Sequence, residues 1–185
     1  TSLDVTLKMR LGWDDNSLNA PYIAARAEAA GIKMITVHGR TRCQFYNGAA
    51  NWAAISKVKA AVSIPVIANG DIVDVASARL ALEQSGADGI MIGRGAQGAP
   101  WRLAEISSKL YGTPEPIIPH GNPLGELIIS HHQAILDFYG EILGVKNARK
   151  HLGWYLDGLQ VTPELRQSLL RSVDISEIHQ FIQRA

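Results

Sequence analysis

The chain has 185 residues, of which 46% are hydrophobic and 19% charged, and its formal net charge is +1. This composition is typical of a globular protein, and the near-neutral charge gives no general attraction to nucleic acid or membranes. No apolar run is long enough to cross a membrane, and a single cysteine, Cys43, excludes a disulfide within the chain. We therefore expect a cytoplasmic protein without a cysteine–histidine metal site.

Four pairs of a strand and a helix are predicted along the first 110 residues. The strands are expected at 5–10, 34–38, 65–69 and 89–92, and the helices at 19–31, 52–61, 74–86 and 100–110. Strands that alternate with helices at this spacing indicate a parallel sheet. Four pairs do not close an eight-stranded barrel, so the sequence indicates either a small open sheet or half of a barrel.

Polar residues follow each predicted strand at its C-terminal end. They are Lys8, Arg10, His38, Arg40, Asn69, Gly70, Asp71, Gly93 and Arg94. Parallel α/β folds bind their ligands at this end of the strands. We therefore expect these residues to form one polar rim.

The glycine-rich stretch after the fourth strand is typical of an anion-binding loop. Gly93, Gly95 and Gly98 lie between the strand and a helix predicted to begin near Pro100, and Arg94 can bind phosphate through two hydrogen bonds. The spacing matches the dinucleotide fingerprint, but that motif belongs to the first unit of a sheet. A phosphate loop late in the series favours a TIM-type barrel.

Each of these residues also has a structural interpretation. Lys8 is a phosphate partner, a Schiff-base lysine or a surface residue, and His38 is a proton donor, a ligand or a hydrogen-bonded core histidine. Residues 69–71 equally describe a plain turn. Cys43 is interpreted as structural because no base is placed beside it.

The second half of the chain has a different pattern. Residues 112–122 form a proline-rich linker, and helices are expected at 123–143, 145–159, 163–172 and 175–185. We therefore predict a domain over 1–111, a linker over 112–122 and a helical domain over 123–185.

The helical domain contains one local cluster of cations. Lys146, Arg149, Lys150 and His151 lie within two helical turns, beside Trp154 and Tyr155. A basic patch flanked by aromatic residues is typical of a nucleic-acid contact. A solvated helix face over core aromatics explains the cluster equally well.

Several motifs together resemble the tRNA-dihydrouridine synthases, and most closely the bacterial B-type group. They are residues 37–42 continuing to Tyr46, Gly48 and Ala50, then 64–71 and 86–95, with Lys8-Met9-Arg10 before them and residues 149–151, 154 and 155 after them. The resemblance covers nearly the whole chain. It implies the C-terminal half of an FMN-binding TIM barrel followed by a helical tRNA-binding domain.

The resemblance also implies an activity and the residues that serve it. The family reduces the C5–C6 double bond of a tRNA uridine to give 5,6-dihydrouridine, with FMN as cofactor and NADPH as electron donor. The expected FMN ligands are Lys8, His38, Asn69, Gly70, Asp71, Gly93 and Arg94. The expected tRNA contacts are Arg40, Lys146, Arg149, Lys150 and His151.

The family's proton-donating cysteine lies upstream of the lysine strand, so the resemblance implies a fragment that is inactive alone. Cys43 is not assigned that role, and no catalytic residue is expected in this chain. Two alternatives remain open: another FMN-dependent barrel oxidoreductase similar to dihydroorotate dehydrogenase, or a non-catalytic module that binds RNA or phosphate.

Overall fold

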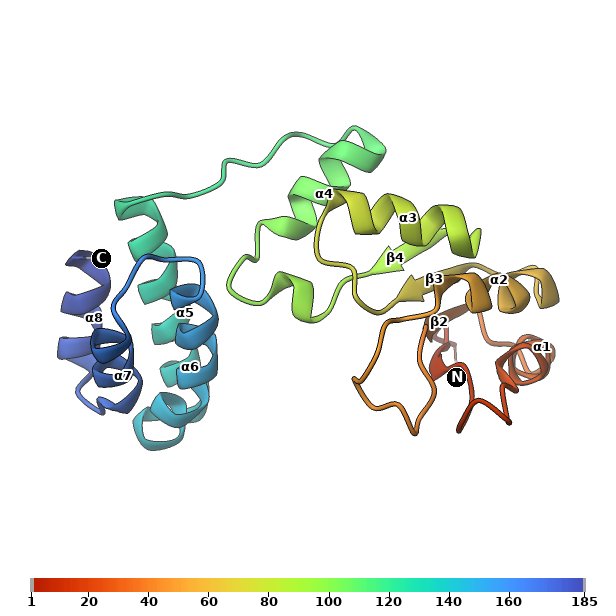
Figure 1. Ribbon diagram of the computed structural model, residues 1–185, viewed down its shortest axis with the longest axis horizontal. Helices are drawn as coiled ribbons and strands as arrows, with labels where there is room; N and C mark the ends of the chain where they lie inside the picture. Colours follow the sequence, from red (N-terminus) through yellow and green to blue (C-terminus); the bar gives the residue numbers. More distant parts are fainter. Residues whose placement is uncertain (1, 185) are drawn as a thin grey trace. The chain divides into compact units, whose positions relative to one another are not determined.

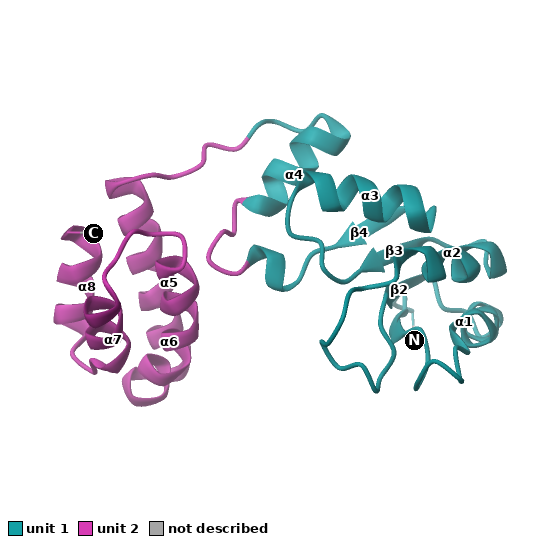
Figure 2. Ribbon diagram, viewed as in Figure 1, with its two compact units in different colours: residues 1–96, 102–115 teal, residues 97–101, 116–185 magenta. Residues whose placement is uncertain are grey.

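The computed structural model describes residues 2–184, and it divides into two compact units (Figures 1 and 2). The first unit comprises residues 1–96 and 102–115, and the second comprises 97–101 and 116–185. Inclusion of the short segment 97–101 in the second unit was not indicated by the sequence. Within the described residues, no helix is long and apolar enough to cross a membrane.

The first unit alternates strands and helices, which confirms the predicted α/β pattern. Its elements are β1 (Thr6–Arg10), α1 (Ala20–Ala29), β2 (Met34–His38), α2 (Trp52–Ala61), β3 (Val66–Asn69), α3 (Val75–Ser85), β4 (Gly89–Met91), the 3-10 helix η1 (Arg94–Ala96) and α4 (Arg102–Tyr111). The four strands form one parallel sheet in the order β1-β2-β3-β4.

This sequential order of strands is the order of a barrel segment. In a doubly wound sheet the order reverses, and helices then cover both faces. Right-handed crossovers between strands that follow one another place the helices on one face of the sheet. The structure therefore fits part of a TIM barrel.

The two faces of the sheet carry different residues, because successive side chains of a strand point to opposite sides. One face carries the apolar residues Leu7, Met9, Ile35, Val37, Val66 and Ala68, which pack in one core with residues of α1 and α2. The other face carries the polar residues Lys8, Thr36, His38 and Asn69, together with Ile67 and Met91. The alternation therefore separates a helix-covered core from a polar face.

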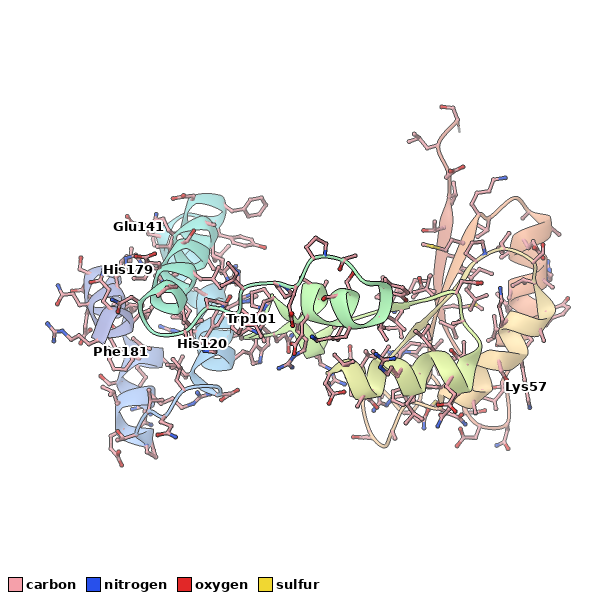
Figure 3. The ribbon with its side chains drawn as sticks, turned by 90° about the horizontal axis from the view of Figure 1, so that it is seen from above. Lys57, Trp101, His120, Glu141, His179 and Phe181 are labelled. Atoms are coloured by element: carbon pink, nitrogen blue, oxygen red, sulfur yellow. The ribbon has the colours of Figure 1, made fainter. Side chains whose placement is uncertain are left out.

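Local signals in the sequence set the ends of the helices in this unit. The Asn51 side chain accepts a hydrogen bond from the Ala54 amide at the start of α2. Asp74 and Ser77 form a capping box at the start of α3, and Gly86 ends that helix in the left-handed conformation. Lys57 extends from the exposed side of α2, and Figure 3 labels it.

The second unit contains the helices α5 to α8. They are α5 (Asn122–Tyr139), α6 (Glu141–Leu156), α7 (Pro163–Arg171) and α8 (Ile175–Arg184). Their common core includes Ile128, Leu152 and Ile178, and Trp101 packs against it from the segment 97–101 (Figure 3).

The predicted break between residues 143 and 145 is wrong. The first of these helices ends at Tyr139, because Gly140 adopts a left-handed conformation with φ of 74°. Gly144 instead lies inside α6, where a Cβ would be 2.9 Å from the Leu136 Cα. Gly144 therefore allows α5 and α6 to pack closely and does not end a helix.

Candidate functional site

A pocket of about 400 Å³ lies at the C-terminal ends of the four strands. Pockets for small molecules usually range from about 300 to 1,000 Å³. The lining residues are Lys8, His38, Tyr46, Asn69, Gly70, Asp71, Ile72, Val73, Met91, Gly93, Arg94 and Gly95. All seven residues expected to bind FMN therefore line one pocket, and their role as FMN ligands remains a prediction.

The register of the sheet explains this convergence. Arg10 is paired with His38, His38 with Asn69, and Asn69 with Met91 across the four strands. These residues form one row on the polar face, and Lys8 lies on the same face two residues earlier in β1.

Asp71, which lines the pocket, forms an ion pair with the buried Arg40. Arg40 Nη1 donates to Asp71 Oδ1 at 2.8 Å, and Arg40 Nη2 donates to Oδ2 at 2.6 Å. Two parallel hydrogen bonds of this kind fix the position of both groups. Arg40 also donates to the backbone carbonyl groups of Asn47 and Gly48. The pair therefore joins the end of β3 to the loop that follows β2.

Arg40 does not lie where the resemblance placed it. It was expected beside the substrate, but the residue is 2% exposed and its guanidinium is hydrogen-bonded to groups of this chain. This position makes Arg40 a structural partner of Asp71. The sequence did not indicate the burial, because the two residues are 31 positions apart.

Asp71 is held in an uncommon conformation. Its φ is 55°, in the left-handed region that few residues other than glycine adopt. Burial alone would raise the pKa of this carboxyl, but hydrogen bonds from Arg40 and from the Ala50 amide, with the charges of Arg40 and Arg94, hold it below its usual value. Asp71 is therefore ionised at neutral pH.

The preceding residue must be glycine. Gly70 has a φ of 111°, and a Cβ there would be 2.7 Å from the His38 Cδ2 and 2.9 Å from the Ala50 Cβ. The Trp52 indole donates to the Gly70 carbonyl at 2.8 Å. The turn thus lets β3 end against the ring of His38.

His38 is neutral at pH 7. Burial, and then the positive charges of Arg10, Lys8 and Arg40, lower its pKa to about 4. Arg40 Nη1 lies 3.4 Å from His38 Nε2. Since a guanidinium can only donate, Nε2 accepts, and the proton of the neutral ring resides on Nδ1.

The other polar side chains that line the pocket are two cations, Lys8 and Arg94, and the amide of Asn69. Burial and the charge of Arg10 lower the pKa of Lys8. The Asn69 amide nitrogen donates to the Met91 carbonyl at 2.8 Å, so the side-chain oxygen is the acceptor that Asn69 can offer. Arg94 lies 3.7 Å from Asp71, and its side chain is 57% exposed. These groups suit an anionic ligand that also carries hydrogen-bonding ring atoms.

Only two of the three glycines in the loop after β4, Gly93 and Gly95, line the pocket. Gly98 belongs to the second unit, where a Cβ on it would be 2.3 Å from the Trp154 carbonyl oxygen of α6. After η1 the fourth helix begins at Arg102, two residues later than predicted, and Arg102 donates to the Gly95 carbonyl at 3.0 Å.

Sequence reasoning assigned no role to Tyr46, which lines the pocket. The guanidinium of Arg94 lies 4.5 Å from the centre of its ring, and that of Arg10 lies 5.6 Å from it. In the sequence, the only indication of a role for Tyr46 was its place in the motif that begins with residues 37–42.

The four members of the cation cluster, Lys146, Arg149, Lys150 and His151, have different surroundings. Lys146 and Arg149 line a groove of about 250 Å³ with Ile142, Val173 and other residues, and Lys150 is exposed. His151 instead packs in ring contacts against His131 and Trp154. The predicted contact of these cations with tRNA remains a prediction. Among residues 2–184, no three metal-binding side chains are grouped to hold an ion.

We expect the Arg40–Asp71 pair to contribute more to stability than a surface pair. Removing one partner of a buried pair costs about 3–5 kcal/mol, and because Asp71 is 30% exposed we expect Arg40→Met to cost about 2–3 kcal/mol. The matched control is Lys59→Met at the partly exposed Lys59–Asp88 pair, which should cost at most about 1 kcal/mol. Urea unfolding measures both, and equal losses would contradict the assignment.

The neutral state of His38 gives a pH dependence. Its pKa of about 4 lies below the value of 6.5 expected for an unfolded chain, so the unfolded chain takes up a proton first. Stability should therefore fall between pH 6.5 and 4, and His38→Gln should remove that part of the fall. The exposed His120 provides the control variant, His120→Gln. A His38 ring signal that titrates near pH 6.5 in NMR would contradict this prediction.

Comparison with known proteins gives one consistent family. The chain is 60% identical over 172 residues to a protein of Rhodobacter capsulatus named "Probable tRNA-dihydrouridine synthase". The matched region covers 93% of this chain and 52% of that protein. A protein of the same name from Rickettsia conorii is 55% identical over 89% of this chain and 50% of its own length. The "tRNA-dihydrouridine synthase B" of Vibrio vulnificus is 47% identical over 89% of this chain and 51% of its own length.

These relatives and the family match cover most of the sequence. The chain spans about half the length of the curated relatives it matches. The family model described as dihydrouridine synthase (Dus) matches residues 1–185. The chain therefore belongs to the dihydrouridine synthase family.

Proposed function

We propose that this chain contributes the phosphate side of an FMN site to an enzyme that reduces uridine in tRNA to 5,6-dihydrouridine. The observation that supports the proposal most directly is the pocket at the strand ends, where Lys8, His38, Asn69 and Arg94 converge. The four parallel strands would form the C-terminal half of a (β/α)8 barrel, whose phosphate site commonly follows its last strands.

The residues of the pocket fit the parts of FMN. Arg94 is an exposed cation of the pocket, and Gly93 beside it has no atom within 4 Å of a Cβ position, so a phosphate can approach the backbone there. Lys8 and His38 would contact the flavin ring or the ribityl chain. Asn69, Gly70 and Asp71 would hold the ribityl chain. Asp71 is already paired with Arg40, so its negative charge does not oppose the phosphate.

The residues described here would bind and orient the cofactor. When bound, FMN supplies the hydride for the C5–C6 double bond and is recharged by NADPH. His38 is neutral and offers its Nδ1 proton as a hydrogen bond, and Lys8 supplies a positive charge on the same face of the sheet. No residue of this chain is assigned as the proton donor, and Cys43 is a free, exposed cysteine outside the residues that line the pocket.

The second unit would contact tRNA. Lys146, Arg149 and Lys150 of α6 are the cations proposed to bind its backbone. His151, which is engaged in ring contacts, would position Trp154. The names of the relatives favour tRNA as the substrate over the small pyrimidine of a dihydroorotate dehydrogenase.

A comparison of FMN with riboflavin tests the site. Riboflavin lacks the phosphate, so Arg94→Ala should weaken FMN binding about tenfold, as loss of one charge-assisted contact, and leave riboflavin binding unchanged. Arg26→Ala, on the exposed side of α1, is the control. Flavin fluorescence titration measures each affinity. Equal losses for both flavins, or binding of neither, would contradict the proposal.

A further inference from the structure

Three exposed aromatic side chains lie in the loops at the C-terminal ends of β1 and β2, and one of them, Tyr46, lines the pocket. Trp13 is 64% exposed, Phe45 54% and Tyr46 59%. They belong to the segments that follow β1 and β2, and these two segments run side by side. The Arg42 amide donates to the Gly12 carbonyl at 2.9 Å, and the Cys43 amide donates to the Trp13 carbonyl at 2.8 Å. We call Trp13, Phe45 and Tyr46 the aromatic rim.

Two rings of the rim are stacked with arginine. The Arg42 guanidinium lies 4.3 Å from the centre of the Phe45 ring, and that of Arg94 lies 4.5 Å from the centre of the Tyr46 ring. A guanidinium plane and an aromatic ring are both surfaces on which a nucleobase stacks. The rim therefore combines stacking surfaces with positive charge.

The backbone holds the rim in a fixed conformation. Phe45 has a φ of 51°, which is costly for a residue other than glycine. Arg10 compensates by donating to the Phe45 carbonyl at 2.8 Å and to the Thr41 carbonyl at 2.6 Å. Strained conformations of this kind occur at binding sites, where the surrounding structure maintains them. The ring of Phe45 is thus fixed in an exposed position and does not pack in the core.

The charge around the rim is unbalanced. Within residues 2–184, no ion pair joins Lys8, Arg10 or Arg42 to a carboxylate. Two acids, Asp14 and Asp15, follow Trp13 and offset part of the positive charge of Lys8, Arg10, Arg42 and Arg94, and Asp14 accepts hydrogen bonds from the Asn16 amide and the Ser17 hydroxyl. The rim therefore offers positive charge to a partner, and an anionic partner complements it.

These features favour single-stranded nucleic acid over the other anionic partners. Proteins bind unpaired strands by stacking their bases on aromatic side chains and by placing cations along their backbone. An acidic peptide would use the cations but would gain little from flat exposed rings. The aromatic rim also adjoins the pocket, because its member Tyr46 is one of the residues that line the pocket.

We propose that Trp13 and Phe45, with Arg42, form a stacking platform for the unpaired RNA bases that flank the uridine to be reduced. This inference rests on the proposed function. An enzyme that acts on a base must take it out of its stack, and the neighbouring bases then lose a stacking partner. Trp13 and Phe45 replace that partner, so they act as positioning residues for the substrate.

The test measures binding of this chain to a labelled single-stranded RNA of about 12 uridines, a length within the usual range of single-strand sites. We expect Trp13→Ala and Phe45→Asn each to weaken binding about tenfold, as loss of one stacked base would. Asparagine suits the left-handed backbone at position 45. The control is Tyr22→Ala, because Tyr22 is 63% exposed and stacks with Arg26 away from the pocket.

The variants must separate stacking from folding and from flavin binding. Trp13→Phe should retain most of the RNA affinity, and FMN affinity should stay unchanged in all these variants. Unchanged RNA affinity in Trp13→Ala and Phe45→Asn would overturn the proposal, as would equal competition by polyglutamate or by duplex RNA. If FMN does not bind but RNA binding still depends on the rings of Trp13 and Phe45, the proposed FMN site is contradicted and the stacking platform is still supported.

Discussion

The ion pair between Arg40 and Asp71 is the contact on which the pocket depends. It joins residues 31 positions apart, and it secures the loop after β2 to the turn after β3 through both carboxylate oxygens. The same arginine binds two carbonyl groups of the loop and lies beside the ring of His38. One buried guanidinium therefore holds Asp71 and the loop that carries Tyr46, and its charge adds to the burial and the other cations that lower the pKa of His38.

The sheet supplies the second constraint. Its strands are parallel and follow one another in sequence order, so the helices cover one face and the polar side chains of each strand share the other. Cations, an amide and a neutral imidazole then meet at one edge although 86 positions separate Lys8 from Arg94 (94 − 8). A ligand that has an anionic end and a hydrogen-bonding ring suits that edge, and the FMN proposed above is such a ligand.

The sequence predicted those features that depend on local pattern. The bounds of β2 and α2 agree with the prediction, because apolar periodicity and the cap at Asn51 define them. The seven pocket residues were predicted because all parallel strands present their C-terminal ends at one edge. The burial of Arg40 was not predicted, since it depends on a distant partner. The exposure of Trp13 and Phe45 depends on loop conformation, and the presence of Gly144 inside α6 depends on close packing against Leu136 of α5, which no local pattern contains.

The central claim is that the strand ends of this chain bind the phosphate end of FMN. An NMR titration of the backbone amides of the isotope-labelled chain with FMN tests it most directly. The account predicts that the amide signals of Gly70, Gly93, Arg94 and Gly95 shift together, in proportion to bound FMN, while those of α7 and α8 stay in place. Shifts confined to the second unit, or no shift at Gly93 and Arg94, would contradict it.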